Sequence, residues 1–239
     1  MRRIWGIGIV IIGIGMWYYG GTSGEVHLVN LGIAAIILGL AITALPLRGH
    51  VDREAIFLSC TPLCRFIGSL SSDLGLEGSP VVIPPYENLP MGGIFLPKFK
   101  DFDIPLGKFD EKTIFLDGSG RESGVLLAPP PGSGIVEYTI ENVGNLKGSG
   151  IGYASSAVSS VLSALGLGSA EVFEKEEGTI EVFVRPLCDG PWYADPVVSA
   201  VLLGIAMGSE ELIRIESLEE KNGHVRLIVR RLGGVEKWL

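Results

Sequence analysis

Two long apolar runs open the chain. The first covers residues 4–20 and the second residues 28–47, and across both runs and their connection the only charged residue is Glu25. A run of about 20 apolar residues matches the thickness of a hydrocarbon core, and a shorter run can cross when aromatic rings mark its ends. The pattern therefore predicts a transmembrane helical hairpin over residues 1–48.

The basic residues that flank the two runs predict the orientation of this hairpin. Arg2 and Arg3 precede the first run, Arg48 and Arg53 follow the second, and the connecting loop has neither Lys nor Arg. Lys and Arg collect on the cytoplasmic side of membrane proteins, so both termini are expected in the cytoplasm. In the alternative that residues 1–24 are a cleaved signal peptide, the second run still crosses and the large domain stays on the same side.

Glycines recur every seven residues along both runs. A step of seven returns to nearly the same face of a helix, and small residues there allow two backbones to approach closely. We expect these glycines to mark a packing face, either within the hairpin or between copies in a homo-oligomer: Gly6, Gly13, Gly20, Gly32 and Gly39, with Gly8 and Gly15 on a parallel line.

Two further apolar stretches lie in residues 49–239, which we interpret as a cytoplasmic α+β domain. Residues 156–169 read SAVSSVLSALGLGS and residues 196–209 read PVVSAVLLGIAMGS. Each stretch is about 13 residues long, which is too short to span a bilayer. We therefore expect two buried core helices.

The sequences that follow the two stretches are also similar to each other. An alternating strand, a charged turn and a second alternating strand come after each helix, with Gly178 in one turn and Asn222-Gly223 in the other. Alternation with period two around Asn-Gly is a strong signal for a β-hairpin. The sequence predicts repeated αββ units at about 154–187 and 195–232, which form an antiparallel sheet covered by helices.

The rest of the domain gives weaker signals. Residues 53–76 have a helical pattern that Pro62 is expected to break. TIFL and GVLLAPP suggest a second hairpin, and IVEYTIENV suggests a short helix or strand. We expect residues 84–110 to form an irregular but ordered loop, whose phenylalanine side chains pack against the domain.

The charge of the domain excludes some partners. The chain past Leu47 carries 17 of the 19 basic residues and 26 of the 27 acidic ones, a formal excess of nine negative charges. An acidic surface repels phosphate, so nucleic acid is not an expected partner, and the domain is poorly suited to clamp anionic lipid head groups.

One candidate ligand site is KGSGIGYASS, residues 147–156, which opens the first core helix. Glycines before a helix N-terminus can expose backbone N–H groups to an anion such as phosphate. The residues would be Lys147, Gly148, Gly150, Gly152 and Ser155. The segment does not match a phosphate-loop pattern, and the alternative is a flexible connection capped by Ser155 or Ser156.

A second candidate is CDGPWYADP, residues 188–196, where Trp192 and Asp195 could form a pocket rim. The alternative is a turn in which Asp195 caps the helix that begins at Pro196. Cys60 and Cys64 would share one helix face, but the spacing does not indicate a zinc site, and no metal or cofactor is expected. The predicted cytoplasmic location argues against a structural disulfide.

The sequence resembles uncharacterised archaeal membrane proteins with two N-terminal spans and one cytoplasmic domain. The resemblance depends on the RR start, VNLGIAAIILGLAITALP, GIFLP, GVLLAPPPGSG and LSALGLGSAEVFE. It implies an architecture and no activity. The residues favour a membrane-tethered binding or scaffold module, with the lipid bilayer and a membrane or cytoplasmic protein as partners. The alternative is a membrane-anchored enzyme or a nucleotide or small-ligand sensor that uses residues 147–156 and 188–195.

Overall fold

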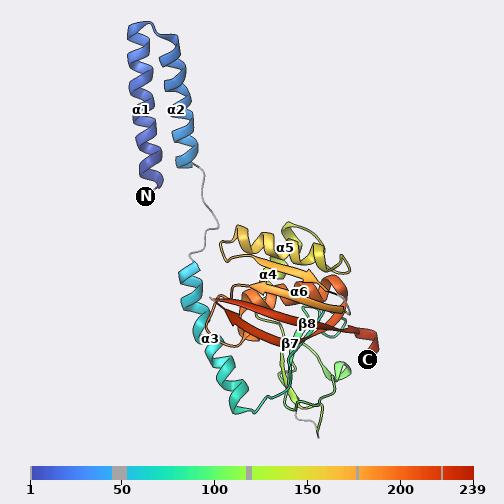
Figure 1. Ribbon diagram of the computed structural model, residues 1–239. Helices are drawn as coiled ribbons and strands as arrows, with labels where there is room; N and C mark the ends of the chain where they lie inside the picture. Colours follow the sequence, from blue (N-terminus) through green and yellow to red (C-terminus); the bar gives the residue numbers. More distant parts are fainter. Residues whose placement is uncertain (1, 45–52, 117–119, 176–177, 222) are drawn as a thin grey trace. The chain divides into compact units, whose positions relative to one another are not determined.

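The computed structural model describes residues 2–44, 53–116, 120–175, 178–221 and 223–239 (Figure 1). The chain forms two compact units, Met1–His50 and Val51–Leu239. The expected end of the second apolar run at Pro46 and Leu47, the flanking Arg48, and Asn222 of the predicted hairpin turn lie outside the described residues.

The first unit consists of two helices, α1 (Arg2–Ser23) and α2 (Val26–Ala44), that pack against each other. They touch at glycines. A Cβ atom on Gly13 would lie 2.9 Å from the carbonyl oxygen of Gly32, and one on Gly39 would lie 2.8 Å from that of Gly6. Gly8 has open space around it. The predicted glycine packing is therefore found within the hairpin, where side chains would force the backbones apart.

The second unit contains an eight-stranded antiparallel sheet in the order β3-β4-β2-β1-β7-β8-β6-β5. The pairing of β1 with β7 joins the N-terminal strands to the C-terminal ones, with Val82 opposite Ile213. The strands are β1 (Val81–Ile83), β2 (Gly93–Pro97), β3 (Phe115–Leu116), β4 (Gly124–Leu127), β5 (Ala170–Glu174), β6 (Thr179–Val184), β7 (Glu211–Lys221) and β8 (His224–Gly234).

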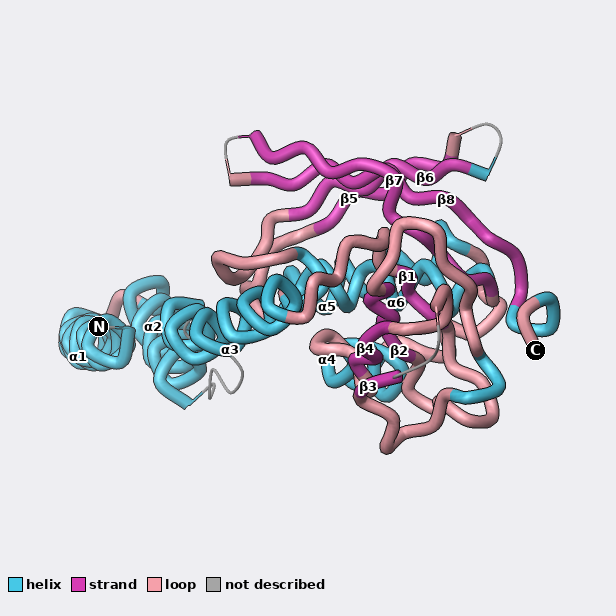
Figure 2. The backbone as a smooth tube through the Cα atoms, turned by 90° about the horizontal axis from the view of Figure 1, so that it is seen from below, coloured by secondary structure: helices cyan, strands magenta, loops and turns pink. Residues whose placement is uncertain are grey.

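Three helices lie against one face of this sheet: α4 (Ser133–Asn142), α5 (Ile151–Ala164) and α6 (Pro196–Ser209) (Figure 2). Every residue of α6 from Val197 to Gly208 is buried, and α5 buries one face. Both stretches are thus core helices, as the sequence predicts. Each is followed by an antiparallel strand pair, and the residues expected to share a face do enter the main core: Ile180, Val182, Val184, Val225, Leu227 and Val229.

The opposite face of β1, β2 and β4 is covered by chain with little regular structure. Phe95 and Phe109 are buried there with their ring centroids 5.2 Å apart, whereas Phe99 is 44% exposed. Short 3-10 helices among the described residues lie at Leu106–Lys108, Trp192–Ala194 and Val235–Lys237. The irregular loop expected over 84–110 is interrupted by β2, because GIFLP can pair with both β1 and β4.

Helix α3 (Arg53–Asp73) corrects one expectation. The helix continues through Pro62 instead of breaking there. Pro62 is exposed, so its ring meets no neighbouring element, and the helix loses one backbone hydrogen bond. Thr61, Cys64 and Ser71 are buried on the side that faces the domain, and these contacts hold the two halves of the helix in line.

Candidate functional site

A cleft of the second unit lies beside the N-terminal half of α3. We call it the α3 cleft. Its volume is about 710 Å³, which is within the range of small-molecule sites. It is lined by three parts of the fold: Arg53, Glu54 and Phe57 from α3; Arg185, Pro186, Leu187, Cys188, Asp189, Gly190 and Trp192 after β6; and Leu218, Glu220, Gly223 and Val225 from β7, β8 and their turn.

Arg53 links the start of α3 to the wall of this cleft through hydrogen bonds. Its guanidinium donates hydrogen bonds to the carbonyl oxygens of Leu167, at 2.8 Å, and Pro186, at 3.3 Å. Burial lowers the pKa of Arg53, and the like charge of Arg185 adds to that effect. The two cations therefore lie near each other in a cleft whose remaining lining combines apolar side chains with three carboxylates, those of Glu54, Asp189 and Glu220.

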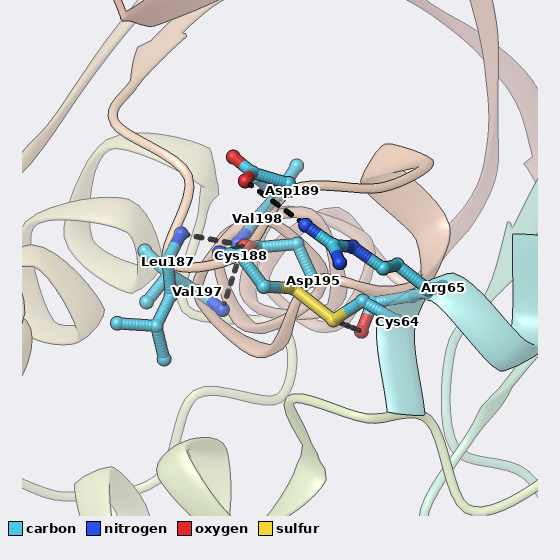
Figure 3. The surroundings of a disulfide bond; sticks show 9 residues. Cys64, Arg65, Leu187, Cys188, Asp189, Asp195, Val197 and Val198 are labelled. Atoms are coloured by element: carbon cyan, nitrogen blue, oxygen red, sulfur yellow. Dashed lines mark hydrogen bonds and ion pairs between the residues drawn. A yellow bond between two sulfur atoms is a disulfide. The ribbon is translucent and has the colours of Figure 1, made fainter. Parts of the chain in front are cut away.

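A disulfide between Cys64 and Cys188 joins α3 to the segment after β6 (Figure 3). Both cysteines are buried, at 1% and 5% exposure. A Cβ atom on Gly190 would lie 3.1 Å from the Cβ atom of Cys64, so a glycine allows the segment to approach the helix. The expectation of no structural disulfide is wrong: the fold brings together two cysteines that lie 124 positions apart, which no local pattern could reveal.

The third cysteine, Cys60, is free and packs against the same cluster one helical turn away. Burial raises the pKa of its thiol, and the negative charge of Asp195 raises it further. Because the thiolate is the reactive form, Cys60 is a poor nucleophile in this position.

Asp195 organises the segment that carries Cys188 (Figure 3). One carboxylate oxygen accepts the backbone N–H groups of Val197 and Val198, which makes Asp195 the N-cap of α6. The other accepts those of Leu187 and Cys188. Burial raises the pKa of Asp195, and the four N–H groups oppose that shift. The capping role that the sequence suggested is confirmed, and Asp195 is absent from the lining of the cleft.

The glycine-rich segment serves a packing function at the other end of α6. Gly148 and Gly150 donate their N–H groups to the carbonyl oxygens of Met207, at 3.0 Å, and Gly208, at 2.9 Å. A Cβ atom on Gly208 would lie 2.7 Å from the carbonyl oxygen of Gly150. These N–H groups therefore satisfy the last carbonyls of α6 and are not aimed at an anion.

The remaining candidates from this segment are dispersed. Lys147 lines a separate depression of about 420 Å³ and pairs with Glu210 at 3.9 Å. Gly152 and Ser155 line a third, of about 450 Å³, next to β5. The cap expected at Ser155 or Ser156 is wrong, since Gly150 is the N-cap of α5 and no side chain caps that helix.

The two candidate segments do not form one site. Asp195 lies at the start of α6, whereas Gly148 and Gly150 bond to its end. A helix of 14 residues is about 21 Å long, so the segments are separated by roughly that distance. Of the individual site residues proposed from sequence, Trp192 lines the α3 cleft, and Cys188, Asp189 and Gly190 of the same predicted loop line it as well. Arg53 and Arg185 were missed as site residues because no motif connects them.

Comparisons with known proteins do not identify the chain: no family model matches it, and neither curated proteins nor solved structures give a match. Within the described ranges, no group of three or more His, Cys, Asp or Glu residues is placed to hold a metal ion. Among the same residues, α3 is the one helix long and apolar enough to cross a membrane, and Val26–Ile42 is a shorter apolar stretch.

Proposed function

We propose that this protein is a membrane-tethered cytoplasmic binding module and that the α3 cleft is its ligand site. In this proposal α1 and α2 form the membrane anchor. The single charge between residues 4 and 47 and the outward-facing apolar side chains of both helices support an anchor. Membership of the archaeal membrane-protein group that the sequence motifs resemble is part of the same proposal.

The observation that carries the proposal is the way in which the α3 cleft is held in shape. Its walls come from α3, the segment after β6 and the β7–β8 pair. Covalent and polar links hold the first two walls together: the Cys64–Cys188 disulfide, the Arg53 hydrogen bond to Pro186 and the Asp195 network. A cleft that is fixed before binding loses less conformational entropy when a ligand enters. The mixture of two guanidinium groups, three carboxylates and apolar side chains suits a small ligand that has both an apolar part and a polar part.

A cleft-filling variant tests this proposal. Leu218 lies on β7, lines the α3 cleft and is 45% exposed, so Leu218→Trp should fill the space without disturbing the core. The matched control is Ile114→Trp, at a site that is 69% exposed and does not line the cleft. Full-length protein purified from its own membranes would be analysed by native mass spectrometry.

We expect a small non-covalent ligand on the native chain and on Ile114→Trp, and its loss from Leu218→Trp. Equal occupancy in all three proteins would refute the α3 cleft as the ligand site. If no ligand is found on any of them, a stoichiometric protein partner in a pull-down from native membranes would favour the scaffold form of the module, with a protein instead of a small molecule as its target.

We also infer that the α5-β5-β6 and α6-β7-β8 segments derive from an internal duplication. The support is the sequence match at a shift of 40 positions together with the order helix, strand, strand after both Gly150 and Asp195. The duplication would account for a core in which two similar helices pack side by side on one face of the sheet.

A further inference from the structure

Helix α3 has an apolar face that nothing in the second unit covers. One side of the helix buries Thr61, Cys64 and Ser71 against the domain. The other side exposes large apolar residues with helical spacing: Leu58 (64% exposed), Leu63 (56%), Phe66 (62%) and Leu70 (36%). We call these four residues the outer face of α3. Between Glu54 and Asp73 the helix carries one charge, Arg65.

This composition makes α3 apolar enough for a span, but its contacts do not allow one. Cys64 is joined covalently to Cys188, and Arg53 is bonded to two carbonyl groups of the domain. A transmembrane helix would have to pull these polar partners into hydrocarbon, which is strongly unfavourable. The remaining way to bury the outer face in lipid is for α3 to lie along the bilayer surface.

The chain itself keeps α3 near such a surface. Eight residues, 45–52, separate the end of α2 from the start of α3. Even fully extended, this connection reaches no more than about 30 Å. The start of α3 is therefore confined to a layer next to the end of the proposed anchor, where the effective concentration of lipid surface is high.

We propose that the outer face of α3 inserts into the acyl–headgroup boundary of the bilayer, so that α3 is an interfacial helix that holds the α3 cleft at the membrane surface. This rests on the proposed function, in which α1 and α2 are the anchor. Arg65, whose guanidinium is 3.7 Å from the Asp189 carboxylate and exposed, keeps its charge in water while its stem lies along the lipid.

The acidic domain sets the type of lipid contact. Insertion driven by apolar side chains does not depend on anionic head groups, and a formal excess of nine negative charges past Leu47 repels them. The helix is thus expected to contact phosphatidylcholine vesicles at least as well as vesicles that contain phosphatidylglycerol.

The test places a polarity-sensitive fluorophore on the outer face in the full-length chain. Phe66→Cys in a Cys60→Ser background leaves one reactive thiol, because the disulfide occupies the other two cysteines. The matched control is Tyr138→Cys in the same background, on α4 and 44% exposed. Both proteins are reconstituted into phosphatidylcholine vesicles with and without nitroxide-labelled acyl chains, and a gel shift checks that the disulfide is intact.

We expect flotation of both proteins with the vesicles, a blue-shifted emission at position 66, and ~3-fold stronger nitroxide quenching there than at position 138, since an interfacial helix buries its apolar face several ångströms into the acyl boundary. Emission at position 66 that matches position 138 in floating protein would overturn the interfacial helix and leave the anchor standing. A blue shift without nitroxide quenching would show that a protein partner or a second copy covers the face, and would also overturn it. Failure to float would overturn the anchor and with it this inference.

Discussion

Asp195 is the residue on which the arrangement around the disulfide depends most. Its carboxylate is the partner of four backbone N–H groups, two from the first turn of α6 and two from the segment with Cys188. A buried N–H group without a partner is unfavourable by about 1–3 kcal/mol, and loss of an N-cap by about 1 kcal/mol. One side chain thus fixes both a helix start and one wall of the α3 cleft.

We therefore expect Asp195→Ala to destabilise the second unit by about 3 kcal/mol, which lowers Tm by roughly 10 °C for a domain of this size. Thermal unfolding followed by circular dichroism would measure this loss of stability. Asp195→Asn keeps an oxygen acceptor for part of the network, so its loss of stability should be markedly smaller. Equal melting of Asp195→Ala and the native chain would contradict the network.

Glu181 gives a prediction about pH. It is buried on β6 and receives hydrogen bonds from Lys175 and Arg226, which lower the pKa of its carboxyl below the ordinary 4.5. A lowered folded pKa means that the stabilisation is fully present above about 4.5 and is lost as pH falls through the folded value.

The Tm difference between the native chain and Glu181→Gln should accordingly be largest near neutral pH and shrink below pH 4.5, as measured by a melting series from pH 3 to 7. Glu174→Gln, an exposed position on the neighbouring strand β5, is the control and should follow the native curve. A constant difference across the series would show that Glu181 acts through packing and not through its charge.

At the scale of elements, α5 and α6 are held by complementary small residues. Gly204 faces Val158, and Gly208 faces Ala154 and the carbonyl of Gly150, so the two helices cross at close range. Most exposed positions of α5 are small residues, and Tyr153, which is 48% exposed, is the one large exception among them.

Val161→Asp should unfold the second unit, because Val161 is 5% exposed and a lone carboxylate would enter the core. We expect the free energy of unfolding to fall by at least about 4 kcal/mol. Ser160→Asp, one position away on the exposed face, is the control. Circular dichroism of the two variants would distinguish them, and an unchanged melt of Val161→Asp would exclude the core position of α5.

The α1–α2 pair offers an equally direct comparison. Gly13→Leu would place a Cβ atom 2.9 Å from the carbonyl oxygen of Gly32, whereas Gly15→Leu meets nothing within 4 Å. In detergent micelles, amide hydrogen exchange in α1 and α2 should accelerate for Gly13→Leu only. The second unit should keep its Tm in both variants, and a shift there would reveal coupling between the units.

These elements also show what a sequence can predict. Short-range signals were reliable: Asp195 before Pro196 marked a helix start, and alternation from Ile180 to Val184 marked a strand. Pro62 misled because its effect depends on what surrounds the ring. The disulfide, the α3 cleft and the use of Gly148 all depend on contacts between distant parts of the chain, and these are set by packing that no local pattern encodes.

At the scale of the whole molecule, the flanking arginines and the disulfide bear in opposite directions on the proposed cytoplasmic side. The flanking arginines favour the cytoplasm. Disulfides are rare in most cytoplasms, although they are common in the intracellular proteins of hyperthermophiles. The burial of both sulfur-bearing residues makes this bond inaccessible to soluble reductants once the fold is complete.

Labelling of intact cells would decide between the two sides. In a Cys60→Ser background, Glu25→Cys should react with a membrane-impermeant maleimide in intact cells, because Glu25 lies between the two helices and is exposed. Tyr138→Cys should react only after lysis. Labelling of position 138 in intact cells would place the second unit outside.

The pairing of β1 with β7 and the bond between Cys64 and Cys188 also determine when the domain can assemble during synthesis. A nascent chain that has emerged only as far as α5 has β2 but not β7 beside β1, and it lacks Cys188, the disulfide partner of Cys64 in α3. The two halves of the sheet can pair only after the ribosome has translated past Arg214 in β7. The apolar surface of β1 and β2 therefore stays exposed through most of translation. Premature termination in the last strands should therefore yield an aggregating product, whereas α1 and α2, which contact each other locally, need nothing that follows them.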